Sequence, residues 1–261
     1  MKTFVEEQFV SGSSNKISSN AWKLVVLILA IAVGAAVYFH IANLEKESIA
    51  IRKHIYSIEG KLTAEKRVPR FLSGILGPDF HTPLDETVFL ELRLDGKQVA
   101  DADLEKCGHL ADLKILGLVE TSVTNTGMQY LAGMTKLEGL RLDYTKVNDL
   151  SVLKNMPKLT SLSLRHTSVR DEDLEVVEHL SNLTYVGMGY CKIQQVGIAH
   201  LAKIPQLTSL SVEGLELSDE DMKLLHGFTN LELIDMENTV VSDAALDELK
   251  KALPKLKIGG R

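Results

Sequence analysis

Three acidic clusters in this 261-residue chain could bind a metal ion, because neighbouring carboxylates are the ligands that Ca²⁺ and Mg²⁺ prefer. They are Asp101/Asp103, Asp171-Glu172-Asp173 and Asp219-Glu220-Asp221. All three recur at the same phase of an internal repeat, where Asn125, Asp149 and Asp243 also stand. A dedicated metal site would be singular, whereas capping of helix N-termini requires an acceptor at every helix start. We therefore interpret the clusters as helix caps and predict no metal site.

Other reactive residue types form no catalytic constellation. The eight histidines do not cluster at ligand spacing, and His109, His179, His200 and His226 fall where we expect exposed outer helix surfaces. No G-x-S-x-G, H-E-x-x-H, P-loop or G-x-G-x-x-G motif occurs. Cys107 and Cys191 lie several repeats apart, too far for a disulfide, so we predict free thiols that fill the core. The sequence predicts no enzyme activity and no cofactor.

A 24-residue repeat must position these side chains. Counting from Leu159 as position 1, positions 1, 4, 6, 11, 16, 19 and 22 are apolar in every copy. The copies start at Phe89, Leu113, Leu137, Leu159, Leu183, Leu207 and Leu231, with a fragment at Leu256. The third copy is two residues shorter than the others. A fixed period of this length is typical of a solenoid, in which each unit buries its apolar face against its neighbours.

Each repeat reads as a strand followed by a helix. The first half alternates as L-x-x-L-x-L, which places positions 4 and 6 on one face of a short strand. The second half spaces apolar residues by three, which suits one face of a helix. We predict an α/β solenoid with a parallel sheet inside and helices outside.

The pattern resembles the leucine-rich repeat family over residues 89–258, and is similar to bacterial repeats with Thr at position 9. It also resembles the cysteine-type repeats of eukaryotic ubiquitin-ligase adaptors. Position 9 holds Thr121, Thr145, Thr167, Thr239 and Cys191, where typical members carry Asn or Cys, while Lys97 and Leu215 depart from the pattern. Threonine can still satisfy a buried backbone group and leucine cannot. The resemblance implies a curved solenoid whose concave sheet binds proteins.

An apolar segment precedes the repeats. From Leu24 to Ala42 the chain reads LVVLILAIAVGAAVYFHIA without a charge, about 28 Å as a helix, which matches a bilayer core. Trp22, Lys23, Tyr38 and His40 stand at its ends as interfacial anchors do. A cleaved signal peptide is disfavoured because its apolar core is usually shorter, and a buried soluble helix lacks a partner. We predict a single-pass membrane anchor over residues 22–42.

The flanking basic residues do not decide the orientation of this anchor, because Lys16 and Lys23 precede it and Lys46, Arg52 and Lys53 follow it. A short tail before an uncleaved anchor commonly leaves the N-terminus in the cytoplasm. We therefore expect the repeat domain on the non-cytoplasmic side of the membrane.

Three further segments complete the predicted organisation. Residues 1–21 form a polar, disordered tail. Residues 43–70 form a helical juxtamembrane stalk, in which Ile51, Ile55, Ile58 and Leu62 make a stripe that could mediate homo-oligomerisation. Residues 71–88 contain scattered apolar residues between glycines and prolines, and we interpret them as an N-terminal cap over the first repeat.

The charge is uneven and argues against nucleic acid as a partner. Residues 89–261 carry 19 Lys+Arg and 26 Asp+Glu, and residues 213–248 carry 11 acids against the single base Lys223. A nucleic-acid surface requires a basic footprint. The acidic end either attracts basic partners or serves as a solvated face.

The candidate binding site consists of the non-repeating residues at positions 3, 5, 7 and 8, which should project from the sheet into the concavity. We call these positions the concave face. Tyrosine and arginine are enriched in interface hot spots. The middle repeats gather the predicted partner-binding residues Arg141, Asp143, Tyr144, Arg165, His166, Tyr185, Tyr190 and Glu213. Gly187 and Gly189 are expected to leave a shallow dent beside the tyrosine rings.

The sequence therefore predicts a membrane-tethered module that binds a protein or peptide through its concave face. Ordinary solvent-facing decoration of the strands is the alternative reading of the same residues. A second hypothesis is a structural or envelope-organising protein that self-associates. A third, by resemblance alone, is a substrate-recognition subunit of a ubiquitin ligase, although residues 43–88 contain no F-box-like pattern.

Overall fold

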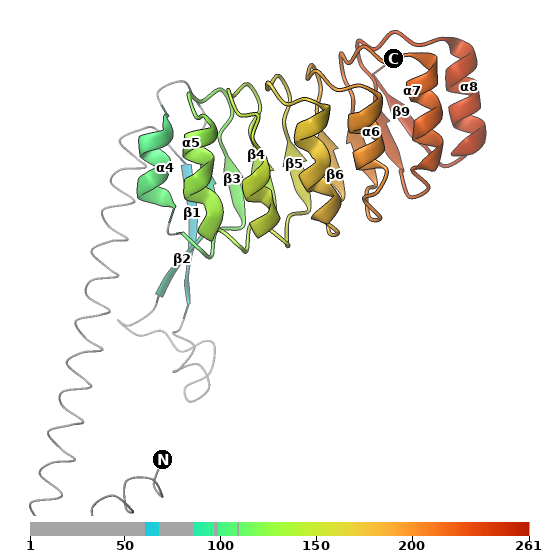
Figure 1. Ribbon diagram of the computed structural model, residues 1–261. Coiled ribbons are helices and arrows are strands. Elements are labelled where there is room, and N and C mark those ends of the chain that lie inside the picture. Colours follow the sequence, from blue (N-terminus) through green and yellow to red (C-terminus); the bar gives the residue numbers. More distant parts are fainter. Residues whose placement is uncertain (1–60, 68–85, 95, 97–98, 109, 261) are drawn as a thin grey trace, which may run out of the picture. The chain divides into compact units, whose positions relative to one another are not determined.

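The computed structural model describes residues 61–67, 86–94, 96, 99–108 and 110–260. All of them lie in Ser48–Arg261, the larger of the two units into which the chain divides. Within this region the predicted α/β solenoid is confirmed (Figure 1).

A nine-stranded sheet runs the length of the solenoid in the strand order β1 to β9. β1 (Lys61–Arg67) pairs antiparallel with β2 (Glu86–Arg93), and every later pair is parallel. The short parallel strands occupy positions 3 to 5 of each repeat: β3 (Ile115–Gly117), β4 (Gly139–Arg141), β5 (Ser161–Ser163), β6 (Tyr185–Gly187), β7 (Ser209–Ser211), β8 (Leu233–Asp235) and β9 (Lys257–Gly259). Their register is unbroken, so equivalent residues of neighbouring repeats lie side by side.

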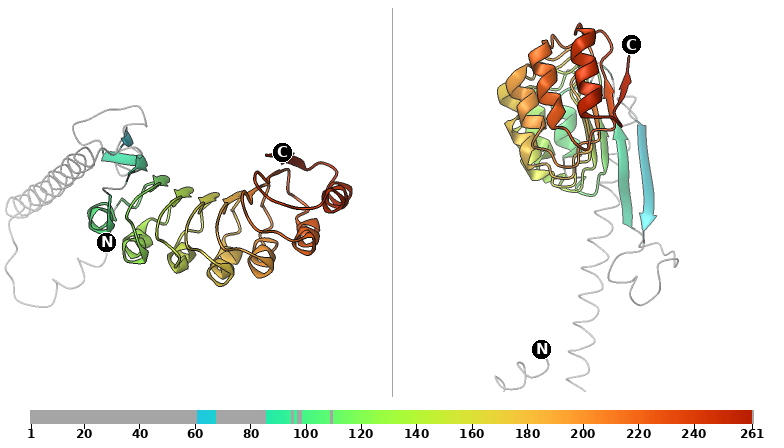
Figure 2. Two further views of the ribbon diagram at one scale, coloured as in Figure 1. Left: turned by 90° about the horizontal axis from the view of Figure 1, so that it is seen from above. Right: turned by 90° about the vertical axis from the view of Figure 1, so that its right-hand side faces the viewer.

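Helical segments line the outer side of the arc that the strands describe (Figure 2). The α-helices are α4 (Asp101–Cys107), α5 (Asn125–Met128), α6 (Gln195–Leu201), α7 (Asp219–Leu224) and α8 (Asp243–Ala252). The 3-10 helices are η1 (Gln129–Gly133), η2 (Ser151–Asn155), η3 (Asp171–His179) and η4 (Leu225–Gly227). The two-residue-shorter third repeat carries only the short helix η2, because the chain has less length to span the same side.

The apolar repeat positions form one continuous core between sheet and helices. Leu116, Leu140 and Leu162, at position 4 of successive repeats, are completely buried. In the short third repeat Leu150, Leu153 and Met156 fill the helix side. Burial of such side chains contributes about 25 cal/mol for each Å² removed from water, so the stacked leucines are the main source of stability.

Position 9 is a hydrogen-bonding position, as the sequence predicts. The hydroxyls of Thr121, Thr145, Thr167 and Thr239 each donate to the carbonyl three residues earlier, at 2.6–2.8 Å. The Cys191 thiol donates instead to the Leu164 carbonyl of the preceding repeat, at 3.0 Å. Leu215 is buried there and its side chain cannot form such a bond. The sixth repeat therefore lacks this internal tie.

The acidic clusters cap helices, but position 13 does so differently from the prediction. The carboxylates of Asp103, Asp173 and Asp221, at position 15, accept the backbone N–H at the N-cap of their own helix. The carboxylates of Asp101, Asp171 and Asp219, at position 13, accept the N–H of the N-cap residue in the next repeat, at 2.7–3.1 Å. Position 13 therefore ties neighbouring repeats together on the outer side, which the prediction of local capping missed.

The structure describes only part of the N-terminal region for which the sequence makes predictions. The helical stalk predicted for residues 43–70 is wrong for Lys61–Arg67, which form strand β1 and include Leu62 of the predicted stripe. The pairing with β2 explains this, because β1 hydrogen-bonds along its length to the first strand of the solenoid. The rest of that stripe, the anchor from Leu24 to Ala42 and most of the predicted cap lie outside the described residues. Among the residues that are described, no helix is long and apolar enough to cross a bilayer.

Both cysteines are free and buried, as predicted. Burial raises the pKa of the Cys107 thiol to about 11, and the nearby Asp103 carboxylate adds to this shift. The prediction of exposed histidines is wrong for His200 and His226, which are half-buried. His200 contacts the Glu178 carboxylate of the preceding repeat, and Lys203 binds the same carboxylate at 2.7 Å. These two partners hold the pKa of Glu178 below its usual range.

Replacement of Thr145 by Val tests the contribution of the position-9 hydrogen bonds. The two side chains have the same shape, so the change removes the 2.7 Å bond to the Leu142 carbonyl with little change in packing. We expect the free energy of unfolding to fall by about 1 kcal/mol, measured by denaturant titration of the full chain. Thr135→Val, at an exposed turn, is the matched control and should change stability by less than about 0.5 kcal/mol. Equal effects of both substitutions would contradict this role.

Candidate functional site

The candidate site is a column of residues at position 8, just after each strand. In all seven repeats this residue has a left-handed backbone: Gly96, Glu120, Tyr144, His166, Tyr190, Gly214 and Asn238 have φ between +53° and +124°. The N–H of each of the first six donates to the carbonyl at position 7 of the next repeat, for example from Tyr144 to Arg165 at 2.8 Å. The turn and the hydrogen bond together place all position-8 side chains in one line.

Three aromatic rings stack in the middle of this column. The ring centroids of Tyr144 and His166 are 4.3 Å apart, those of His166 and Tyr190 are 4.2 Å apart, and each pair is inclined by 14°. Tyr144 is 50% exposed and Tyr190 is 38% exposed, so the edges of the stack face solvent. The sequence prediction that these three residues lie together is confirmed by their geometry.

Gly214 and Asn238 complete the column beyond Tyr190. A Cβ atom at Gly214 would collide with the Tyr190 ring, so the ring lies across the glycine. The Tyr190 hydroxyl then accepts a hydrogen bond from Asn238 Nδ2 at 2.9 Å. Sequence reasoning missed this pair, although the alignment of Asn238 and Tyr190 at the same repeat position was the signal that could have found it.

The predicted dent at Gly187 and Gly189 does not exist, because neighbouring side chains fill the space that these glycines leave. A Cβ atom at Gly187 would lie 2.6 Å from the Tyr185 hydroxyl oxygen. A Cβ atom at Gly189 would lie 3.0 Å from the Glu213 carbonyl and 3.6 Å from Arg165 Nε. Both glycines are buried. Gly187 therefore leaves room for the Tyr185 hydroxyl, and Gly189 allows the close approach of Glu213 on the next coil.

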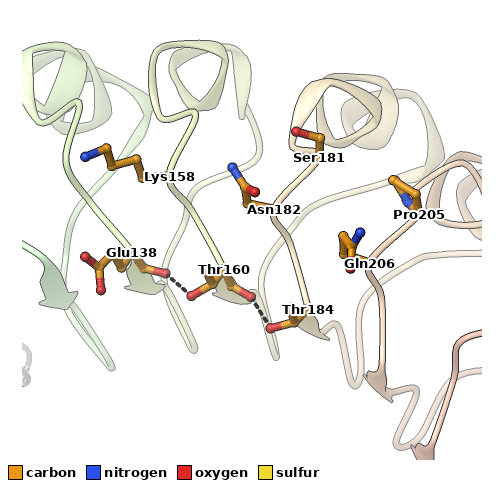
Figure 3. A pocket seen from close by; sticks show the side chains of 8 residues that line it. All are labelled: Glu138, Lys158, Thr160, Ser181, Asn182, Thr184, Pro205 and Gln206. Atoms are coloured by element: carbon orange, nitrogen blue, oxygen red, sulfur yellow. Dashed lines mark hydrogen bonds between the residues drawn. The ribbon is translucent and has the colours of Figure 1, made fainter.

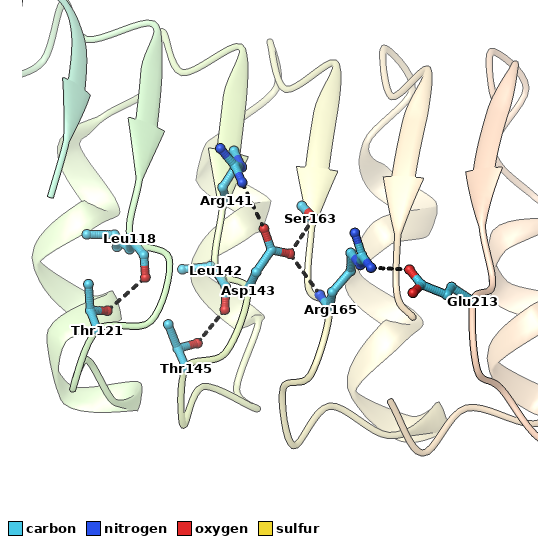
Figure 4. A network of polar contacts seen from close by, with 9 residues as sticks. All are labelled: Leu118, Thr121, Arg141, Leu142, Asp143, Thr145, Ser163, Arg165 and Glu213. Atoms are coloured by element: carbon cyan, nitrogen blue, oxygen red, sulfur yellow. Dashed lines mark hydrogen bonds and ion pairs between the residues drawn. The ribbon is translucent and has the colours of Figure 1, made fainter. Parts of the chain in front are cut away.

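A polar network runs beside the stack (Figure 4). The Asp143 carboxylate accepts hydrogen bonds from the Ser163 hydroxyl and from the Arg165 backbone N–H, the latter at 3.0 Å. Arg141 Nη2 lies 3.5 Å from the same carboxylate. Arg165 reaches across repeat five and pairs with Glu213 through its guanidinium group. The network thus joins residues of repeats three, four and six and crosses repeat five.

This network changes the role of two predicted binding residues. Asp143 is 4% exposed and Glu213 is 8% exposed, so neither offers a contact surface to a partner. Each instead neutralises an arginine whose side chain is more exposed. Asp143 and Glu213 therefore act as supports, and the accessible set reduces to Arg141, Tyr144, Arg165, His166, Tyr185 and Tyr190.

Tyr185 is half-buried and is less accessible than Tyr144 and Tyr190. Burial raises the pKa of its hydroxyl, and the negative charge of Asp143 adds to the shift. The hydroxyl is consequently neutral at physiological pH and can serve as a hydrogen-bond donor, but not as a base.

A depression of about 610 Å³ lies at the opposite ends of the strands from the position-8 column (Figure 3). Its hydroxyls are already used in the scaffold, since Thr160 Oγ1 donates to the Glu138 carbonyl at 2.9 Å and Thr184 Oγ1 to the Thr160 carbonyl at 3.0 Å.

Comparison with known proteins supports the fold. No protein-family model and no curated protein matches the sequence. Among solved structures, an internalin (inlF) of Listeria monocytogenes is similar, with a TM-score of 0.50 and 24% identity over 61% of this chain. A second internalin of that organism (inlC2) has a TM-score of 0.47 and 18% identity, covering 68% of this chain and 87% of its own. This chain spans 51% of the length of the first internalin.

The likeness to the first internalin, together with the parallel sheet, identifies the solenoid as a leucine-rich repeat fold. At this identity it speaks to the fold alone. What the concave face does must be argued from its own residues.

Replacement of Gly214 by Ala tests whether the column is held by this glycine. The added methyl group would collide with the Tyr190 ring, and alanine is disfavoured at the φ of +62°. We expect the free energy of unfolding to fall by about 1–3 kcal/mol, with a changed tyrosine signal in near-ultraviolet circular dichroism. Gly227→Ala is the control, because a methyl group added there would meet no atom within 4 Å among the described residues. An unchanged tyrosine spectrum in Gly214→Ala would show that the ring does not lie on this residue.

Proposed function

We propose that the protein is a protein-binding module, tethered to a membrane by the segment from Leu24 to Ala42, that recognises a protein partner through the stack of Tyr144, His166 and Tyr190. Tyr144 is 50% exposed and Tyr190 is 38% exposed, so the outer edges of the stack are open to a partner. Aromatic residues of this kind dominate binding energy at protein interfaces.

The observation that carries the proposal is backbone strain. Tyr144, His166 and Tyr190 hold φ values of +59°, +53° and +58°, where a residue with a side chain loses about 1–2 kcal/mol. In the four other repeats this position holds Gly96, Gly214, Asn238 and Glu120, and three of these four are glycine or asparagine, which adopt this backbone most easily. Large rings at strained positions support a functional role, because the scaffold alone does not require them.

Preorganisation supports the same conclusion. The rings are ordered by stacking on one another and by the Asn238 hydrogen bond to Tyr190. The nearby Arg141 and Arg165 are held by their ion pairs with Asp143 and Glu213. A surface whose side chains are already ordered loses little conformational entropy when a partner binds. This arrangement favours recognition of a folded protein surface or an ordered segment, and it contains no nucleophile–base pair within the described residues.

Replacing all three rings with asparagine is the direct test. Asparagine is preferable to alanine because Asn238 shows that it fits this backbone at φ +58°. We expect the variant Tyr144→Asn/His166→Asn/Tyr190→Asn to lose partner capture at least about tenfold in membrane crosslinking experiments, while its thermal unfolding stays cooperative.

The matched control removes two exposed apolar residues outside the column, Val196→Asn and Val240→Asn. This variant should capture the partner as the wild type does. Equal capture by all three proteins would rule out the stack as the binding surface. Recovery of the chain itself as the captured species would favour the self-association hypothesis.

The proposed membrane tether makes a separate prediction. The full chain should sediment with membranes, resist extraction at alkaline pH and dissolve in detergent, because 19 uncharged residues would span the bilayer. Deletion of residues 22–42 should release it. In spheroplasts, external protease should digest the repeat domain if it lies on the non-cytoplasmic side. Release of the intact chain by alkaline washing alone would contradict the tether.

A further inference from the structure

The charged residues of the concave face form two sets. We call those that pair with one another the internal set and the remaining ones the external set. Arg141 pairs with Asp143, and Arg165 pairs with Glu213. Both acids are buried beneath their arginines, so these two pairs are neutral and add little to the field of the surface. The binding properties of the face therefore depend on the charges left over.

Among the described side chains at positions 5, 7 and 8, the charged groups outside these two pairs are carboxylates. Glu120 and Glu237 are exposed and Asp235 is half-buried. None of these carboxylates joins an ion pair with another described residue. The Asp235 carboxylate accepts only the weak, 3.2 Å hydrogen bond of the Glu237 N–H among the bonds of this region. These three carboxylates thus have no ion-pair partner within the part of the chain that the structure describes.

The external acids flank the aromatic stack on both sides. Glu120 stands in the position-8 column one repeat before Tyr144, at the same left-handed turn. Asp235 and Glu237 belong to the seventh repeat, beside Asn238, which binds the hydroxyl of Tyr190. A partner lying across the stack would meet carboxylates at both ends.

The hydroxyl of Ser211 lies at the Asp235 end of the stack. Ser211 is the register partner of Asp235 on the neighbouring strand. Ser211 is 5% exposed, and its hydroxyl has no hydrogen-bond partner within the described part of the chain. A buried hydroxyl without a partner costs free energy, so a donor brought next to Asp235 would find an acceptor there as well.

We propose that the partner presents a basic, arginine-bearing segment that lies across the strands of the concave face, with cationic side chains at Glu120 and at Asp235/Glu237 and its middle on the aromatic stack. This inference rests on the proposed function and names the chemistry of its partner. Opposite charge on the two surfaces steers encounter and selects the orientation of binding.

The spacing of the repeats sets the length of this segment. Five strand-to-strand steps separate the repeat of Glu120 from that of Asp235, and each step is about 4.8 Å, which gives about 24 Å. An extended chain rises about 3.3 Å per residue, so about seven residues separate the two cationic ends.

The Tyr144 ring explains why arginine suits the first end better than lysine. One face of the ring stacks on His166, and the other points toward the repeat of Glu120. A planar guanidinium can stack on this second face and pair with the Glu120 carboxylate, whereas an ammonium group cannot make both contacts as well.

Titration of the full chain in neutral detergent with octa-arginine and octa-lysine peptides tests the proposal. We expect Glu120→Gln/Asp235→Asn/Glu237→Gln to weaken octa-arginine binding about tenfold at low salt, from three exposed ion pairs. Glu172→Gln/Glu175→Gln/Glu248→Gln removes three exposed acids from the helix side and should change binding less than about twofold. Tyr144→Asn should lower affinity for octa-arginine about threefold more than for octa-lysine, and Tyr144→Phe should not.

Two results would overturn the inference. One is the absence of octa-arginine binding at millimolar peptide, and the other is an equal loss in the concave and helix-side variants, which would show attraction by net charge alone. The proposed function is tested apart from this by partner capture. If the ring-replaced protein loses its partner while the carboxylate-neutralised protein retains it, the binding surface stands and the basic segment is rejected.

Discussion

The strand-to-strand hydrogen bonds along the solenoid are the interaction on which the remaining structure depends. They hold equivalent residues of neighbouring repeats in register from β2 to β9. They continue past the strands to position 8, where the N–H groups of the first six repeats donate to a carbonyl of the next repeat. Because the coils are separated by one strand spacing, any side chain type that recurs at a position becomes a column. The leucine column gives the core, the position-13 acids give an outer ladder, and the position-8 rings give the stack.

The close spacing of the coils also limits the size of neighbouring side chains on the concave face. Side chains one strand spacing apart crowd each other, so a long side chain can lie flat only where its neighbour is small. Gly214 provides that space for the Tyr190 ring and Gly189 for Glu213, each from the adjacent coil, while Gly187 leaves room for the Tyr185 hydroxyl on its own strand. The glycines that the sequence suggested as a hollow therefore produce a flatter and more rigid surface. Rigidity, rather than depth, is the property that this face offers to a partner.

The predictability of each feature depends on whether it repeats. The core, the parallel sheet and the position-9 hydrogen bonds could be predicted, because leucine and threonine recur at the same positions of a repeat of nearly constant length. Each copy of the repeat therefore supports the prediction made from the others. The grouping of Tyr144, His166 and Tyr190 followed from the same alignment. The burial of Asp143 and Glu213 could not be predicted, since it depends on which arginine each carboxylate pairs with, and the repeat pattern does not specify that partner. Strand β1 was also missed, because its pairing with β2 occurs once and leaves no period.

The division of charge on the concave face has a physical consequence for specificity. If Asp143 and Glu213 were exposed, Arg141 and Arg165 could bind acidic groups of many partners; as buried counter-ions they remove that possibility. Removing either acid would leave an arginine uncompensated next to the rings and would turn the middle of the face positive. The buried acids thus do more than hold side chains in place. They keep the centre of the surface neutral and aromatic, so that the carboxylates at its two ends decide which charge a partner must carry.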